Sequence, residues 1–365
     1  MSYSQFSALY SRFPIPNSRF PIPDSRFPNP SWEGLGVGSD SRFPIPDSRF
    51  PIPDSRFPIP DSRFPIPDSR LPNETMNQQR QKPHYSMCQG FRIPMGFPVT
   101  CFESGLSYNA QPEDNFIVTY PKCGTTWVQH IVWMLNHDGE PLPVGKDINL
   151  EVPHLEEVGA DFVAAMASPR FIKTHISYSF TPYCADAKYI YIARNPFDCV
   201  VSFYYHTKGF VKHYNFAEGT FNDFFECFIE GEVDWGDYFE HLLSWYDHRQ
   251  DDNVLFITYE AMKADTPNYI REIAKFLGSS YLDKLNNAEI FNSILKHTSF
   301  TSMSQDQSRW SSQRPKEMTP FIRKGEIGDW KNHFSDDQIA RLYDKFIKKT
   351  AGTDIAMLWA DLIPN

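Results

Sequence analysis

Short apolar runs rich in β-branched and aromatic residues recur along the chain after residue 112. They occupy residues 116–120, 171–175, 188–193 and 253–260. Each run has the length of one strand and shows little alternation of polar and apolar positions, which is typical of strands buried on both faces of a parallel sheet. The pattern therefore predicts a buried parallel sheet built from these four runs.

Between the runs, the apolar positions change to a helical period. Val128, Ile131, Val132 and Leu135 are spaced i, i+3, i+4 and i+7, as on one face of an amphipathic helix. Alternating strands and helices predict an α/β fold with a central parallel sheet and helices on both faces. We expect residues 83–112 to be loop-like, residues 141–159 to be irregular, and further helices at 161–167, from Pro196, at 267–277 before Gly278 and at 335–349.

Residues 1–82 carry neither pattern. They hold half of the chain's 30 prolines and repeat the heptad Ser-Arg-Phe-Pro-Ile-Pro-Asp, with copies beginning at Ser11, Ser18, Ser41, Ser48, Ser55 and Ser62. Proline at every second or third position removes backbone donors and excludes a regular helix. The segment is therefore predicted to be a disordered, polyproline-like, low-complexity tail, followed by one domain at 83–365. The repeats are either a multivalent ligand for an aromatic groove or, as we favour, an extension without a role in catalysis.

Charge and cysteine spacing narrow the classes of function. The formal net charge of −10 divides into about +2 for residues 1–82 and −12 for the rest. A domain that acidic is a poor general binder of nucleic acid, so a polyanionic ligand would need a local basic cluster. The six cysteines form no C-x-x-C pair and no histidine-spaced metal pattern, which favours reduced thiols and no metal site.

The length of the apolar runs and the composition of the N-terminus bear on membrane insertion and export. No apolar run reaches the ~18–20 residues of a membrane span, and the N-terminus lacks the apolar core of a signal peptide. The sequence therefore predicts a cytoplasmic protein without a membrane partner.

The turn between the first strand and the first helix has the composition of an anion site. It reads Pro121-Lys122-Cys123-Gly124-Thr125-Thr126. Backbone N–H groups at a helix N-terminus point at an anion, a glycine lets the backbone approach, and hydroxyls add donors. The loop is P-loop-like but differs from G-x-x-x-x-G-K-[ST], because its lysine precedes its only glycine.

The other strands also end in residues suited to chemistry. Lys173 and His175 end the second run, Arg194 follows the third, and Tyr259 lies near the end of the fourth. Ligand sites of open α/β sheets lie at the carboxyl ends of the strands, so these side chains are expected to converge. For His175 and Tyr259, a purely structural role is the alternative.

Five motifs carry a resemblance to one family. The string from Thr119 to Trp127, TYPKCGTTW, resembles the 5′-phosphosulfate loop TYPKSGTTW of the cytosolic sulfotransferases (sulfotransferase 1 type) that use 3′-phosphoadenylyl sulfate (PAPS). Residues 173–175 are similar to the family's K-T-H-L-P motif, with Ile176 and Ser177 in place of Leu-Pro. Residues 194–206 resemble its 3′-phosphate motif, residues 297–303 its second nucleotide-contacting segment, and residues 323–331 its R-K-G-x-x-G-D-W-K loop.

The resemblance implies transfer of a sulfuryl group from PAPS to a hydroxyl or amine of a small acceptor that is apolar, aromatic or steroid-like. It implies catalytic roles for His175 as the general base, for Lys122 and for Lys173, without a metal. The implied cofactor-binding residues are Lys122, Cys123, Gly124, Thr125, Thr126, Trp127, Arg194, Ser202, Tyr259, Thr298, Ser299, Phe300, Met303, Arg323, Lys324 and Gly325.

Two expectations concern departures from the family pattern. Cys123 stands where the family usually has serine; beside Lys122 and at a helix N-terminus, its thiol is expected to have a lowered pKa and raised reactivity. Many family members dimerise through K-x-x-x-T-V-x-x-x-E. Here Lys331 is followed by Ser335, Asp336 and Ala340 at the other places, so a homodimer through this motif is not assured.

Two other classes of function remain open. A small-molecule kinase shares the strand, loop and helix, but it should show the G-K-[ST] loop and a carboxylate placed for magnesium, and neither is evident. A binding protein could use its tail and carry a catalytically dead domain. Intact Lys122, His175, Arg194 and Arg323 argue against such decay.

The composition of the tail gives a first prediction. Deleting residues 1–82 is expected to leave melting temperature and turnover nearly unchanged, because a segment that buries little apolar surface contributes little to the fold. Full-length and truncated proteins are compared by thermal unfolding and by turnover. A large loss of activity on truncation would make the tail part of the site.

Overall fold

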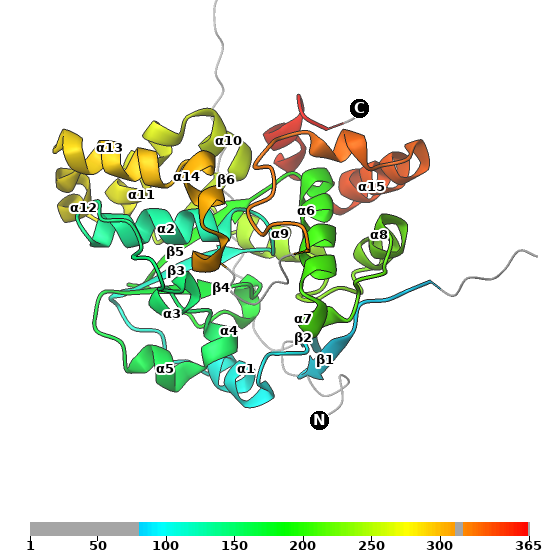
Figure 1. The fold of residues 1–365 in the computed structure, drawn as a ribbon, viewed down its shortest axis with the longest axis horizontal. Coiled ribbons are helices and arrows are strands. Elements are labelled where there is room, and N and C mark those ends of the chain that lie inside the picture. Colours follow the sequence, from blue (N-terminus) through cyan, green and yellow to red (C-terminus); the bar gives the residue numbers. More distant parts are fainter. Residues whose placement is uncertain (1–79, 311–316, 364–365) are drawn as a thin grey trace, which may run out of the picture. The chain divides into compact units, whose positions relative to one another are not determined.

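The computed structural model describes residues 80–310 and 317–363 (Figure 1). The repeat tail lies outside the described residues. The strands are β1 (Tyr85–Cys88), β2 (Phe91–Pro94), β3 (Asp114–Thr119), β4 (Arg170–Thr174), β5 (Lys188–Ala193) and β6 (Val254–Thr258). The helices are α1 (Val99–Leu106), α2 (Thr125–Asn136), α3 (Ile148–Glu151), α4 (Leu155–Val158), α5 (Ala160–Ala164), α6 (Pro196–Gly209), α7 (Val211–Tyr214), α8 (Phe221–Ile229), α9 (Tyr238–Tyr246), α10 (Tyr259–Ala264), α11 (Thr266–Leu277), α12 (Ser279–Lys284), α13 (Ala288–His297), α14 (Phe300–Gln305) and α15 (Asp336–Lys349).

The central sheet has the strand order β4-β3-β5-β6, and all three pairings are parallel. This confirms the predicted parallel sheet. In register, Ile117 of β3 lies opposite Lys173 of β4 and Ile190 of β5. The chain leaves β3 toward β4 on one side and returns to β5 on the other, so a crevice opens between β3 and β5 at their carboxyl ends.

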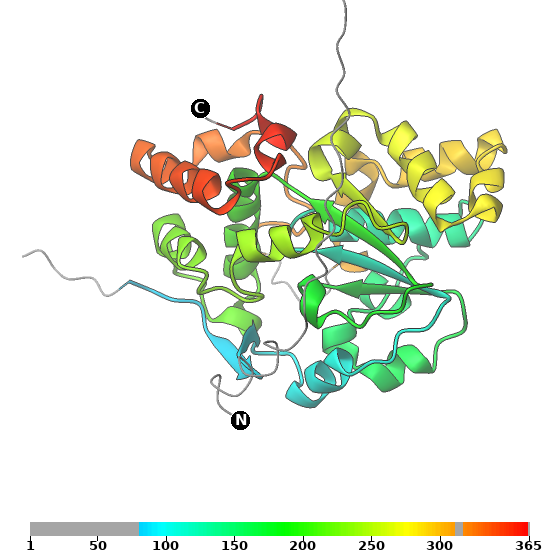
Figure 2. The same cartoon turned by 180° about the vertical axis from the view of Figure 1, so that it is seen from behind.

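Alternate residues of the strands enter two separate cores. Phe116 and Tyr189 pack with residues of α6, α8, α9 and α15, whereas Ile117 and Ile190 pack with residues of α2, α11 and α13. Figures 1 and 2 show α2, α11 and α13 gathered on one side of the sheet and α6, α8 and α15 on the other. Helices on both faces of the sheet are thus confirmed.

Two segments expected to lack regular structure contain short elements. Within residues 83–112, β1 and β2 pair as a hairpin, and α1 follows. Gln89 and Gly90, with φ of 49° and 89°, make the two-residue turn that suits the twist of paired strands. Residues 141–159 contain α3, capped by Asp147, and α4, ended by Gly159. These four- to eight-residue elements are too short to show a periodic pattern among prolines and glycines.

The described residues begin before Pro83, at Arg80. Arg80 pairs with Glu230, and Lys82 with Glu232, across 2.7 Å and 2.5 Å. Because these groups remain in contact with solvent, such pairs are worth only ~0–1 kcal/mol each. Among the described residues, no helix is both long and apolar enough to cross a membrane.

A buried ion pair joins the N-terminal ends of β3 and β4. Arg170 Nε lies 2.5 Å from Asp114 Oδ1, and the Asp114 side chain is closed to solvent. The other carboxylate oxygen of Asp114 accepts from the Tyr108 hydroxyl at 2.9 Å and from the Gln111 backbone N–H at 2.8 Å. The pair therefore fixes the edge of the sheet opposite to the crevice.

Removing one partner of this pair should leave an uncompensated buried charge. Arg170→Ala is expected to lower the free energy of unfolding by about 3–5 kcal/mol, measured by urea unfolding. The matched control is Lys348→Ala, whose partner Asp344 is exposed, and which should change it by less than ~1 kcal/mol. Equal effects of the two substitutions would contradict a structural role for the buried pair.

Candidate active site

A cavity of about 460 Å³ opens at the carboxyl ends of the parallel strands. Its wall is formed by the loops that follow β3, β4, β5 and β6 and by the segments around α14 and residues 321–326. Of the residues expected in the site, the lining includes Lys122, Gly124, Thr125, Thr126, Trp127, Lys173, His175, Arg194, Ser202, Tyr259, Thr298, Phe300, Met303, Arg323, Lys324 and Gly325. The structure thus brings together residues that lie up to 203 positions apart in the sequence, from Lys122 to Gly325.

The loop between β3 and α2 forms one wall of the cavity. Lys122 adopts a positive φ of 69°, and its Nζ lies 3.9 Å from the centre of the Phe321 ring. Gly124 has φ of 107°, and a Cβ there would meet Tyr259 Cδ2 at 3.1 Å. A side chain at this position would be strained and crowded, so glycine is required for the loop to pass Tyr259.

His175 lies directly after β4, and its side chain is 7% exposed. Its Nδ1 is 2.8 Å from the backbone carbonyl oxygen of Thr119. A carbonyl oxygen only accepts, so Nδ1 carries the proton and Nε2 is left with the lone pair. Burial, and after it the charges of Lys173 and His154, hold the pKa of His175 well below its usual range. The ring is therefore a neutral imidazole with one basic nitrogen.

A buried carboxylate supports the end of β4. Glu156 Oε1 accepts from the His175 backbone N–H at 3.0 Å and from the Thr174 hydroxyl. Its Oε2 lies 3.0 Å from His154 Nε2, although without the alignment of a hydrogen bond. Burial raises the pKa of Glu156, but His154 and the Thr174 hydroxyl outweigh it, and the net pKa is lowered. This carboxylate orients the backbone that carries His175.

Lys173 precedes His175 by two residues and also faces the cavity. Its Nζ lies 3.4 Å from Asn149 Oδ1. Burial lowers the pKa of Lys173, and the carboxylates of Glu157, Glu156 and Asp147 oppose that shift. The lysine thus places a partly shielded positive charge next to the imidazole.

Arg194 follows β5 and is 8% exposed. Its guanidinium donates to the backbone oxygens of Lys122 at 3.1 Å and Glu326 at 3.2 Å, and it stacks 4.5 Å from the Tyr259 ring centre. Its Nε is buried without a hydrogen-bond partner, and no carboxylate of a described residue lies within ion-pair distance. A buried cation with neutral partners and one unused donor is suited to receiving an anion.

Asp329 holds both cations of the loop at residues 323–325. Arg323 and Lys324 each donate to it at 2.6 Å. Burial raises the pKa of Asp329, but hydrogen bonds from Lys324, Asn332 and Arg323 outweigh it and hold the pKa far below its usual range. Gly325, with φ of 62°, leaves room for Phe300, whose ring would lie 2.5 Å from an added Cβ.

Two carboxylates that sequence reasoning did not place in the site fix these loops. Asp198 accepts from the backbone N–H groups of Gly328 at 2.7 Å and Trp330 at 3.1 Å. Glu260 accepts from the Asn195 backbone N–H at 2.9 Å and from the Trp359 indole at 2.8 Å. Asp198 lies in the first turn of α6. Its contact across 130 positions of sequence left no local pattern.

Tyr259 lies in the cavity wall, although β6 ends one residue earlier, at Thr258. The expected strand at 253–260 is therefore too long, because the Thr258 side chain caps α10 and Tyr259 begins that helix. Its ring packs edge-on against Trp127, with centroids 5.7 Å apart. The Trp127 indole N–H is buried without a hydrogen-bond partner.

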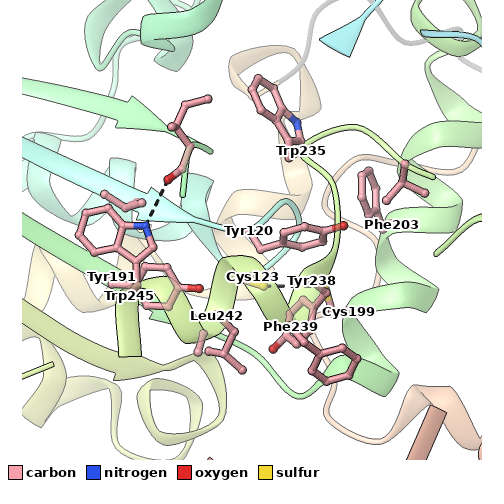
Figure 3. Packing of buried hydrophobic residues seen from close by; sticks show 14 of the residues in the cluster. Tyr120, Cys123, Tyr191, Cys199, Phe203, Trp235, Tyr238, Phe239, Leu242 and Trp245 are labelled. Carbon is pink, nitrogen blue, oxygen red and sulfur yellow. Dashed lines mark hydrogen bonds between the residues drawn. The ribbon is translucent and has the colours of Figure 1, made fainter. Parts of the chain in front are cut away.

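The prediction of a reactive Cys123 thiol is wrong. The side chain is closed to solvent and lies 3.8 Å from both Cys199 Sγ and the Pro121 backbone oxygen. Burial, and after it the Cys199 thiol, raises the pKa of Cys123 well above its usual range. Figure 3 shows the two sulfur atoms within the aromatic core formed by residues such as Tyr120 and Tyr238. The backbone of the loop faces the cavity, but this side chain points the other way.

Ser299 is the other expected residue that does not line the cavity. Its hydroxyl accepts from the Ser302 backbone N–H at 3.2 Å and caps α14. Its neighbours Thr298 and Phe300 do line the cavity. Trp235, His154 and Lys263 also line it. They were missed because each belongs to a segment without a recognised motif.

Comparisons with known proteins agree with this geometry. The family model described as "Sulfotransferase domain" matches residues 112–354. Sulfotransferase 1C2 of Rattus norvegicus is 35% identical over 269 residues, which cover 68% of this chain and 87% of that protein. Sulfotransferase 1E1 of Bos taurus is 36% identical over 249 residues, covering 64% and 82%.

Solved structures give the same picture. The crystal structure of mouse sulfotransferase SULT7A1 complexed with PAP is 28% identical, with a TM-score of 0.60, covering 76% of this chain and 98% of that one. Retinol dehydratase in complex with androsterone and inactive cofactor PAP, at 22% identity and a TM-score of 0.61, shares the fold. The family model, the sequence relatives and the fold agree: the chain belongs to the sulfotransferase family.

Proposed function

We propose that this sulfotransferase uses PAPS as its sulfuryl donor and a hydroxyl group of a small molecule as its acceptor, with His175 as the general base. The observation that carries this assignment is the tautomer of His175, whose Nδ1 is held by the Thr119 carbonyl while the ring shares one cavity with Lys122 and Arg194. A basic nitrogen and two cations in one cavity meet the needs of in-line transfer to a weak nucleophile.

The residues present fit the nucleotide donor. Arg194 Nε and Trp127 Nε1 are buried donors without partners. Gly124 leaves a space beside Tyr259 that a Cβ would fill. Six Lys and Arg side chains line the cavity in a domain whose net charge is negative, which is the local basic cluster that a polyanion needs.

The nucleotide-holding roles divide among the strand ends. Lys122, with the N-terminus of α2 and the hydroxyls of Thr125 and Thr126, would hold the 5′-phosphosulfate. Arg194 and Ser202 would hold the 3′-phosphate together with Arg323, Lys324 and Gly325. Tyr259 and Trp127 would pack on the adenine side, and Thr298, Phe300 and Met303 would complete the nucleotide wall. We do not extend this role to the side chains of Cys123 and Ser299.

The remaining groups act on the reaction itself. His175 Nε2 would take the acceptor's proton as its oxygen bonds to sulfur. Lys122 would stabilise the charge that develops on the departing phosphate oxygen, and Lys173 would steady the sulfuryl oxygens. The Thr119 carbonyl and the Glu156 carboxylate hold the base in place. Positioning and charge stabilisation thus carry the catalysis, as in phosphoryl transfer.

Location and domain limits belong to the same proposal. The six cysteines are free thiols, as is usual in a reducing compartment, which supports the cytoplasm. We propose that residues 83–365 form the catalytic unit and that residues 1–82 take no part in the chemistry.

His175→Ala tests the base. A positioned base contributes ~10²–10⁴-fold, so turnover should fall by at least that range, while the bisphosphate product analogue still binds. The control is His84→Ala, an exposed histidine outside the cavity. Melting temperature, affinity for adenosine 3′,5′-bisphosphate and turnover are measured on the same preparations. Turnover within a few-fold of the parent in folded protein would refute the assigned role.

Arg194→Ala tests the nucleotide site. It removes a charge-assisted hydrogen bond worth roughly 1.5–3 kcal/mol, so affinity for the bisphosphate should fall about 10–150-fold. Calorimetric titration measures this, with Arg249→Ala as the control because that arginine pairs with Asp354 at the surface. Unchanged affinity would place the 3′-phosphate elsewhere.

A further inference from the structure

The two halves of the cavity carry opposite charge. The half built from the nucleotide motifs holds Lys122, Arg194, Lys263, Arg323 and Lys324 against the single carboxylate Glu326. The half around His175 holds the carboxylates of Asp147, Glu157 and Asp234, with Lys173 as its lysine. When the walls of a cavity carry charges of one sign, their electric field favours the binding of ligands of the opposite sign. The second half is therefore unfavourable to an anionic acceptor.

Asp234 is buried, whereas the other two carboxylates are only partly buried. Glu157 Oε2 lies 3.7 Å from His154 Nδ1, and Asp147 Oδ1 accepts the Asn149 backbone N–H at 2.9 Å. The Asp234 side chain is 1% exposed, and the Tyr214 hydroxyl donates to its Oδ2 at 2.7 Å.

The other oxygen, Oδ1, has no hydrogen-bond partner, and no lysine, arginine or histidine of the described chain lies within 4.0 Å of the carboxylate. Burial raises the pKa of Asp234 to about 7. A buried carboxylate without a cationic partner is stabilised when a cation approaches it.

Aromatic rings define the path between Asp234 and the base. The Trp235 ring centre lies 5.6 Å from that of His175, 5.8 Å from His154 and 6.2 Å from Phe97. Trp235 adopts a φ of 67°, which is uncommon for a bulky residue and is often found at ligand sites. This backbone conformation holds the indole of Trp235 against the imidazole of His175. Asp234 is the residue immediately before Trp235. A flat ring next to the base fits the space, and ring faces also attract cations.

We propose that the acceptor is a protonated amine that also carries an aromatic hydroxyl, and that Asp234, assisted by Glu157, selects its ammonium end. The inference rests on the sulfotransferase function proposed above. The hydroxyl oxygen forms a bond to sulfur as the bond between sulfur and the bisphosphate oxygen breaks, and the hydroxyl proton passes to His175 Nε2. The ammonium has no lone pair, so it is recognised and does not react.

Three phenols of matched length test the charge preference of the full-length enzyme with labelled PAPS. Tyramine carries an ammonium, para-propylphenol is neutral, and para-hydroxyphenylpropanoate is anionic. The expected order of kcat/KM is tyramine, then para-propylphenol, then the propanoate. A parent enzyme that prefers either of the last two to tyramine overturns the inference, whatever the variants do.

Asp234→Asn keeps the shape of the side chain and removes its charge. It should lower kcat/KM for tyramine by about 10–150-fold, the loss expected for one charge-assisted contact, and leave para-propylphenol within a few-fold. Glu157→Gln should show a smaller loss of the same kind. The control is Asp186→Asn, an exposed aspartate outside the cavity. Equal losses for all three phenols in Asp234→Asn would mean a structural role and overturn the inference.

Binding measurements separate this inference from the proposed function. Each phenol is titrated into the parent protein and the Asp234→Asn variant, both saturated with adenosine 3′,5′-bisphosphate. If tyramine binds more tightly than the other two phenols to the parent and this preference is lost in the variant, the inference is supported. The absence of sulfated product from all three phenols would refute the proposed reaction, but not this inference. Sulfation of the phenols without any preference for tyramine in binding or turnover refutes the inference alone.

Discussion

Parallel pairing of the strands is the constraint on which the rest of the structure depends. Because β4, β3, β5 and β6 run in one direction and in register, the residues that follow them must emerge at one edge. His175, the loop at Lys122, Arg194 and Tyr259 are those residues. Helices cover both faces of the sheet, and the cavity lies at this edge, where a ligand can reach buried polar groups.

Cations gathered at one edge of the sheet repel one another, and the surrounding residues must stabilise them. Arg194 donates to two backbone oxygens. Asp198 and Glu260 instead accept hydrogen bonds from backbone and indole N–H groups of the neighbouring loops. The two carboxylates thus fix the loops that form the cavity wall without pairing directly with the positive charge of Arg194. This division keeps positive potential in the cavity while each buried carboxylate still has hydrogen bonds. At the other strand end, Glu156 serves His175 in the same indirect way.

The sequence predicts this site well wherever the chemistry lies next to a periodic element. The strand at 188–193 matches β5, and the turn from Asn195 into α6 forms with Asn195 as the cap. The direction of a loop side chain was not predictable. Cys123 lies between cavity-lining residues, yet it turns into the core beside Cys199 because α6 packs there. Contacts such as Asp198 with Gly328 depend on tertiary folding alone, and short elements such as the β1–β2 hairpin carry too few residues for a period.

The pairing of Asp329 with both Arg323 and Lys324 bears on the nucleotide binding that we propose for these two cations. Both cations already have a carboxylate partner, so an arriving phosphate takes part in an exchange of partners. The free energy gained from this loop is the difference between two ion pairs, which is smaller than the charges alone suggest. On the proposed assignment, the reverse exchange would also aid turnover: as the spent nucleotide departs, Asp329 would pair with the two cations again, and the cavity wall would not be left with two unpaired charges.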